Sequence, residues 1–142
     1  MYKNILVTID LAEESSWRRA LPVAVELAEK FGGKLHVATV VRDIDALLKT
    51  QYSLLAYEKL IAEAEQRVAA VVVANVPPEL EPSRTIGQGS IYAEILRIAR
   101  ATNADLIVMA SHRPAMKDYL IGANAARVVR HARCSVLVVR EP

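Results

Sequence analysis

The sequence has few of the features that mark secreted or membrane-embedded proteins. Its single cysteine, Cys134, excludes an internal disulfide and fits a reducing compartment. No apolar run approaches the ~20 residues that a membrane span requires. The first residues lead into an apolar run at 5–9 without the hydrophobic region and cleavage site of a secretory signal. We therefore expect a cytoplasmic protein with no membrane insertion.

Several sequence motifs are also missing, and each absence excludes a class of protein. There are five glycines, and none forms a Gly-x-x-x-x-Gly-Lys-Ser/Thr phosphate loop or a Gly-x-Ser-x-Gly nucleophile elbow. Residues 10–15 hold no glycine, which excludes a dinucleotide-binding fingerprint after the first apolar run. The three histidines lack metal-ligand spacing, so we expect no metal centre. Cys134 has no activating base nearby in the sequence and is interpreted as a packed thiol.

The charge is small overall but unevenly distributed. A net charge of +2 argues against strong nucleic-acid binding. Residues 112–142 hold six Lys or Arg and two acidic residues, so this third carries +4 and the remainder −2. Such a basic region suits a small polyanion such as a phosphate chain. Arg113 is the candidate for that role, whereas Arg127, Arg130 and Arg133 are better explained as a solvated helix face.

Strand and helix patterns alternate along one domain, residues 1–142. Hydrophobic residues make up 53% of the chain and are mostly aliphatic. Apolar runs predict strands at 5–9, 35–41, 84–86 (at an edge), 106–110 and 135–139. Helical patterns follow at 17–31, 54–73, 91–98 and 124–131. Ser15, Ser16 and Ser90 are N-cap candidates, and Gly32 is placed to end the first helix. Pro22 is expected to kink the first helix or to shift its start downstream.

This alternation predicts an α/β fold, an open five-stranded parallel sheet with helices on both faces. Covering both faces requires the strand order to reverse, and we expect the order 3-2-1-4-5. The carboxyl ends of strands 1 and 4 would then face each other across a crevice. Asp10 lies at one of these ends and residues 110–113 lie at the other.

The crevice residues suggest a nucleotide pocket built largely from backbone. Asp10 is suited to accept hydrogen bonds from ribose or adenine, although it is equally suited to cap the first helix. Gly122, Ala123 and Asn124 bring backbone N–H groups to a helix start, where anions bind. Gly122 as a plain turn glycine and Asn124 as an N-cap are the alternatives. Arg113 would add a guanidinium to the phosphates.

At these residues the chain resembles the universal stress protein family. The match runs from "ILVTIDL" through "LHVATVV" and "GQGSIYAEIL" to "LIVMASHRPAMKDYLIGANAARVVRHARCSVLVVR". The resemblance implies a stress-response regulator with an unidentified protein partner. It also implies a homodimer joined through Ser135–Arg140, with tetramers as a further assembly, and bound ATP, with or without Mg²⁺. By position, the implied base and ribose contacts are Thr8, Asp10 and Val40. The implied phosphate contacts are Met109, Ala110, Ser111, His112, Arg113, Gly122, Ala123 and Asn124.

The chain departs from the usual phosphate motif of ATP-binding members, which is Gly-x-x-Gly, nine residues, then Gly-Ser/Thr. Ala110 and Arg113 stand at the first two glycine positions, and eight residues separate Arg113 from Gly122. Ala123 lacks the hydroxyl, and the loss of one hydrogen bond to a charged group costs on the order of 1.5–3 kcal/mol. The chain resembles the members of one branch of the family, which are small, have a single domain and vary in this loop. Two alternatives stay open: a nucleotide-free dimeric interaction module, and a slow ATP hydrolase that uses His112 or Asp118.

Overall fold

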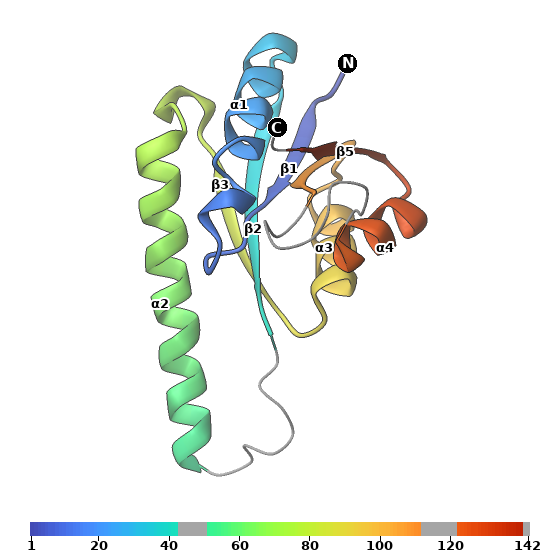
Figure 1. Cartoon of the computed structure of the whole chain (residues 1–142). Helices are drawn as coiled ribbons and strands as arrows, with labels where there is room; N and C mark the ends of the chain where they lie inside the picture. Colours follow the sequence, from blue (N-terminus) through green and yellow to red (C-terminus); the bar gives the residue numbers. More distant parts are fainter. Residues whose placement is uncertain (43–50, 112–121, 141–142) are drawn as a thin grey trace.

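A computed structural model describes residues 1–42, 51–111 and 122–140 (Figure 1). Its sheet has five strands joined in parallel in the order β3-β2-β1-β4-β5. The strands are β1 (Asn4–Thr8), β2 (Lys34–Val41), β3 (Ser83–Gln88), β4 (Leu106–Ala110) and β5 (Ser135–Val139). The predicted fold class and strand order are confirmed, including the edge position of the third strand.

Within the described parts of the chain, four α-helices cover the two faces of the sheet. They are α1 (Ala20–Phe31), α2 (Gln51–Asn75), α3 (Ile91–Ala101) and α4 (Ala123–His131), with short 3-10 helices η1 (Glu14–Ser16) and η2 (Pro78–Leu80). One buried cluster joins the sheet to α1 and α2, and a second joins it to α3 and α4. Among the residues that the structure describes, no helix is both long and apolar enough to cross a membrane.

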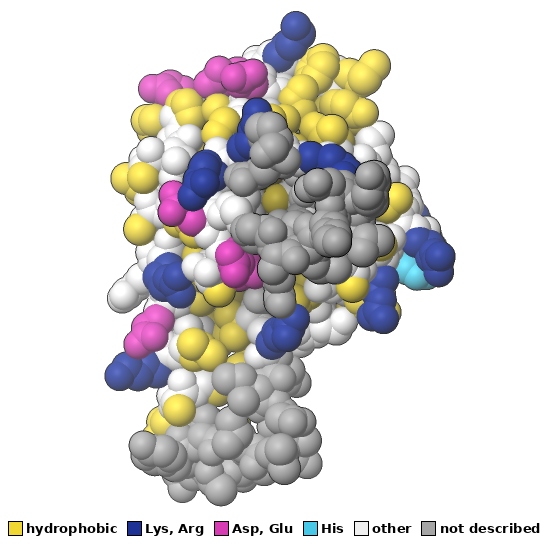
Figure 2. Space-filling view, viewed as in Figure 1, with side chains coloured by type: hydrophobic (Ala, Val, Ile, Leu, Met, Phe, Trp, Pro, Cys, Tyr) yellow, Lys and Arg dark blue, Asp and Glu magenta, His cyan; other side chains and the backbone are white. Residues whose placement is uncertain are grey.

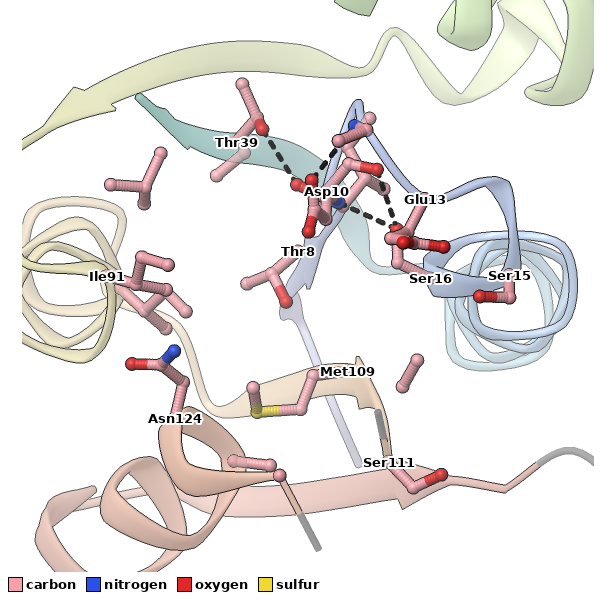
Figure 3. A pocket seen from close by; sticks show the side chains of 18 of the residues that line it. Thr8, Asp10, Glu13, Ser15, Ser16, Thr39, Ile91, Met109, Ser111 and Asn124 are labelled. Carbon is pink, nitrogen blue, oxygen red and sulfur yellow. Dashed lines mark hydrogen bonds between the residues drawn. The ribbon is translucent and has the colours of Figure 1, made fainter. Parts of the chain in front are cut away.

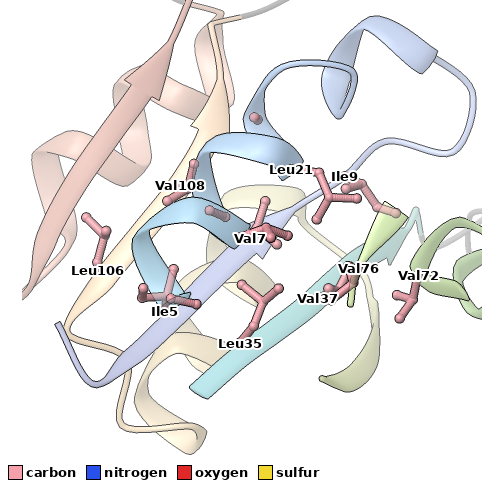
Figure 4. Packing of buried hydrophobic residues seen from close by; sticks show 14 of the residues in the cluster. Ile5, Val7, Ile9, Leu21, Leu35, Val37, Val72, Val76, Leu106 and Val108 are labelled. Carbon is pink, nitrogen blue, oxygen red and sulfur yellow. The ribbon is translucent and has the colours of Figure 1, made fainter. Parts of the chain in front are cut away.

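The alternating direction of side chains along a strand explains why the strands are continuous apolar runs in the sequence. Successive side chains point to opposite faces of a sheet, so both sets are buried when both faces are covered. Val7, Val37 and Val108 point into the cluster under α1 and α2 (Figure 4). Their neighbours Leu6 and Ile107 point into the cluster under α3 and α4. The central strands are thus fixed from both sides, which positions their carboxyl ends.

The start of α1 differs from the predicted serine cap. The helix begins at Ala20, with Arg19 at the N-cap position and no side-chain cap there. Pro22 lies in the first turn, where a backbone N–H has no helical partner to lose. The downstream shift is therefore confirmed and the serine cap is wrong, because the Ser16 hydroxyl bonds to the Asp10 backbone instead. The predicted end is confirmed, since Gly32 adopts a left-handed conformation with φ of 62°.

The second helix is longer than its predicted range and is only partly packed. Ala64, Val68 and Val72 are buried against the sheet, as the apolar stripe predicts. Leu54 and Leu55, near the start of the helix, are 58% and 61% exposed. Figure 1 shows this first part of α2 extending past the sheet. The C-terminal half therefore supplies most of the packing that anchors α2.

Candidate functional site

A cavity of about 620 Å³ opens at the carboxyl ends of β1, β2 and β4 (Figure 3). It arises because β1 and β4 are neighbours in the sheet but their connections leave towards opposite faces. The chain runs from β1 to α1 on one face and from β4 to α4 on the other. Parallel sheets bind ligands at such a reversal of strand order. Nine of the predicted site residues line the cavity: Thr8, Asp10, Val40, Met109, Ala110, Ser111, Gly122, Ala123 and Asn124. His112, Arg113 and Asp118 lie outside the described residues.

One wall of the cavity is the loop of residues 10–16, which folds around Asp10. The Asp10 backbone N–H donates to the Ser16 Oγ at 2.7 Å, and that hydroxyl donates to the Asp10 carbonyl at 3.0 Å. The Asp10 carboxylate accepts from the Ala12 N–H at 2.9 Å. Asp10 therefore caps its own loop rather than α1, and it remains exposed at the cavity. The interpretation of Asp10 as a helix cap is wrong.

The start of this loop is held by a polar side chain that was not predicted from the sequence as a site residue. Thr39 is buried in β2, and its hydroxyl donates to the Ile9 carbonyl at 2.8 Å. The Ile9 N–H donates to the Ala38 carbonyl at 2.9 Å. A buried carbonyl without a partner is costly, so this pair fixes the exit of β1 towards the loop.

The opposite wall is the start of α4. Gly122 is the N-cap residue, and it makes no side-chain cap bond. Its N–H donates to the Ser111 carbonyl at 2.8 Å, and the Ser111 N–H donates to the Val139 carbonyl at 2.9 Å. The turn is thus tied to β5, and the first-turn N–H groups of α4 lie beside the cavity. Asn124 is the second residue of the helix, so its interpretation as the N-cap is wrong.

The two walls differ in charge. Asp10 and Glu13 belong to the loop wall, whereas the α4 wall has a helix N-terminus with its partial positive charge. Arg42, just after β2, also lines the cavity. It lines an adjoining hollow of about 300 Å³ as well, together with Gly89, Ser90, Ile91 and Asn124. An anionic group is therefore favoured near α4 and disfavoured near the loop.

Several residues that line the cavity were not predicted from the sequence. Most follow a strand end or open a helix, which was the available signal, but side-chain direction depends on the tertiary packing. They are Ile9, Ala12, Glu13, Ser15, Ser16, Ala38, Thr39, Arg42, Ile91, Ile95 and Ala125.

The basic side chains of α4 lie away from the cavity. Arg127 and Arg130 of α4, and Arg133 just after it, are exposed and do not line the cavity. Figure 2 shows basic side chains on the side of the molecule where α4 lies. Arg127 makes a specific contact, because its guanidinium carbon lies 5.0 Å from the ring centre of Tyr92. This cation–π contact joins α4 to α3, a packing role on an otherwise solvated face.

The structure shows the surroundings of His36 and Cys134, for which the sequence predicts no metal-binding or catalytic role. His36 lies in β2, with its Nδ1 hydrogen-bonded to the Ser83 hydroxyl, and its Nε2 is buried without a partner among the described residues. Burial, followed by the charge of Lys34, lowers the pKa of His36. Burial also raises the pKa of Cys134, as suits a packed thiol. Within the ranges that the structure describes, no cluster of three or more candidate ligands could hold a metal ion.

The comparisons with known proteins agree on one family. The family model for the universal stress protein family matches residues 1–140. Universal stress protein G of Escherichia coli O157:H7 is 32% identical over 146 residues, covering 99% of this chain and 100% of the relative. The structure of universal stress protein UspA from Lactobacillus plantarum is similar, with a TM-score of 0.73, 26% identity and 98% coverage of both chains. A universal stress protein solved in complex with cAMP matches in fold, with a TM-score of 0.64, 23% identity and coverage of 99% and 98%. This chain belongs to the universal stress protein family.

Proposed function

We propose that this protein is a cytoplasmic stress-response regulator that binds ATP, with or without Mg²⁺, in the cavity between β1 and β4. The observation that carries the proposal is the pairing of the two walls. First-turn N–H groups of α4 face a loop whose exposed Asp10 is suited to ribose or adenine. A cavity of about 620 Å³ lies within the usual size range of small-molecule sites.

The distribution of charge gives the bound nucleotide an orientation. Phosphates belong at the start of α4, because the helix dipole favours anions there and the carboxylates of Asp10 and Glu13 repel them from the other wall. The base belongs between the apolar side chains of Val40, Ile91 and Met109. Thr8, at the end of β1, also lines the cavity.

The relative solved with cAMP supports an adenine nucleotide as the ligand class. The departures at Ala110 and Ala123 leave the backbone donors in place, since an N–H group does not depend on the side chain. Neither alanine introduces bulk that would separate a phosphate from these donors.

Calorimetric titration of the purified protein tests the proposal. We expect ATP and ADP to bind with dissociation constants in the micromolar range, which corresponds to a binding free energy of about −8 kcal/mol. Adenosine should bind much more weakly, because it leaves the α4 wall without its anion. Equal affinity for adenosine and ATP, or no binding of ATP, would contradict the proposed phosphate site.

The same proposal includes a homodimer formed through Ser135–Arg140, with tetramers as a further assembly. β5 is an edge strand, and Leu137 on it is 37% exposed. An edge strand offers backbone groups to a second copy. Sedimentation analysis of the wild type and of Leu137→Lys checks this: the wild type should sediment as a dimer, and the variant should shift towards monomer. A wild-type monomer at high concentration would exclude the assembly.

A nucleotide-free dimeric interaction module is the second candidate, favoured by the missing hydroxyl at Ala123. Native mass spectrometry of gently purified protein separates the two candidates. Retained ATP or ADP supports the first, whereas a bare chain that also fails to bind added ATP supports the second.

A further inference from the structure

We propose that Arg67 of α2 is a positioning residue for the nucleotide cavity, and that it couples the occupancy of the cavity to α2. The inference rests on the proposed nucleotide binding. Its basis is one hydrogen bond between distant parts of the chain: the Arg67 Nη2 donates to the Leu11 carbonyl at 2.6 Å. Arg67 itself does not line the cavity, so its influence acts through the loop.

The loop that accepts this bond needs support from outside. The hydrogen bonds that Asp10, Ala12, Glu13 and Ser16 make with one another are local, each closing a turn within residues 10–16. Local bonds shape a loop but do not fix it relative to the sheet. The bond to the Leu11 carbonyl adds a tie from the middle of the segment between β1 and η1 to α2, beyond the Thr39 bond at Ile9.

The other end of the bond is on a firmly packed part of α2. Ala64 and Val68, on either side of Arg67 in the sequence, are 5% and 0% exposed. The stem of Arg67 therefore starts from backbone that cannot shift without opening the core. The Leu11 side chain packs against the same cluster from the loop side. Arg67 thus joins the wall of the cavity to a rigid element.

This tie has an energetic consequence. A loop that is already held when the nucleotide arrives loses less conformational entropy on binding, so affinity is higher. Coupling between two sites is reciprocal, so a nucleotide that holds the loop also stabilises the contact with α2. A guanidinium bond to a carbonyl is charge-assisted, and its loss should weaken ATP binding about five- to tenfold.

The experiment compares the wild type with Arg67→Ala, Arg67→Lys and the control Arg100→Ala. Arg100 is an exposed arginine near the end of α3, on the other face of the sheet. Calorimetry should show ATP binding weakened about five- to tenfold in Arg67→Ala, restored to within about threefold in Arg67→Lys, and unchanged in Arg100→Ala. If Arg67→Ala does not fold, Arg67→Gln, which keeps part of the stem but cannot reach Leu11, replaces it with the same expected loss.

Hydrogen exchange provides a readout that a purely structural role would not move. In the wild type, ATP should increase the protection of amides in residues 11–16 and in residues 63–70, and in Arg67→Ala the second increase should disappear. Unchanged ATP affinity in Arg67→Ala, or an undiminished ATP effect on α2, would overturn the inference. If the wild type binds no ATP, the proposed function fails. Arg67 is then tested on the ligand-free protein, where exchange of residues 11–16 that is no faster in Arg67→Ala would overturn the tie itself.

Discussion

The two walls of the cavity differ in what shapes them: side chains shape the loop wall, and main-chain groups shape the α4 wall. The loop wall depends on side chains, because the Asp10 carboxylate and the Ser16 hydroxyl determine its shape through bonds of 2.7–3.0 Å. The α4 wall depends on main-chain groups, with Gly122 tied to Ser111 and no side-chain cap. A side-chain wall is sensitive to the identity of its residues, whereas a main-chain wall is sensitive to bulk. A main-chain wall can therefore line the cavity with alanine at positions 110 and 123.

The largest expected effect comes from adding bulk to the main-chain wall. Gly122→Val places a branched side chain where a phosphate would approach the N–H groups of α4. Each such bond to a charged group contributes on the order of 1.5–3 kcal/mol, so ATP affinity should fall at least about a hundredfold by calorimetry. Ala126→Val, which adds the same side chain to an exposed position of α4, is the control. Equal losses in both variants would mean that α4 is generally disturbed.

A smaller loss is expected from the side-chain wall. Asp10→Ala removes the acceptor of the Ala12 N–H and the proposed contact with ribose or adenine, so ATP affinity should fall about tenfold. Asp10→Asn keeps an oxygen for the Ala12 N–H and should lose less. A hundredfold loss in Asp10→Ala with little change in Gly122→Val would reverse the assigned roles of the two walls.

A gain of affinity is expected where the family's hydroxyl is missing. Ala123→Ser adds a donor beside the first-turn N–H groups, on an exposed residue of α4. The gain in ATP affinity should be about three- to tenfold, with adenosine binding unchanged. The same factor for adenosine would show that the new hydroxyl does not contact a phosphate.

The smallest effect concerns a polar group far from both walls. Because burial lowers the pKa of His36 from 6.5, the unfolded chain binds a proton near pH 6.5 that the folded protein does not bind until lower pH. The free energy of unfolding should therefore decrease as the pH falls from 6.5 towards the lowered value. His36→Gln should flatten this slope in urea unfolding series, while any offset at pH 8 reports only the changed packing. An identical slope in the variant would remove His36 as its cause.

The sheet could be predicted from the sequence because burial on both faces leaves continuous apolar runs, such as residues 106–110. The crevice followed from topology, since covering both faces forces the strand order to reverse. The start of α1 could not be predicted with the same certainty. Ser16 has the right chemistry for a helix cap, but its hydroxyl bonds to Asp10 once the loop folds.

The lining side chains were harder to predict than the strand ends. Thr39 has no sequence signal beyond its place in an apolar run, and its role depends on meeting the Ile9 carbonyl just after the end of β1. The bond from Arg67 to Leu11 joins residues that are 56 positions apart, and helical periodicity alone gives Arg67 an exposed surface position. Tertiary contacts of this kind determine how the cavity is held.

The most direct test is a crystal structure of the protein grown with excess ATP. We expect density for the nucleotide between β1 and β4, with its phosphates against the N–H groups that open α4 and its base beside Val40. A phosphate chain against the loop wall of residues 10–16, or a cavity still empty at saturating ATP, would contradict this expectation.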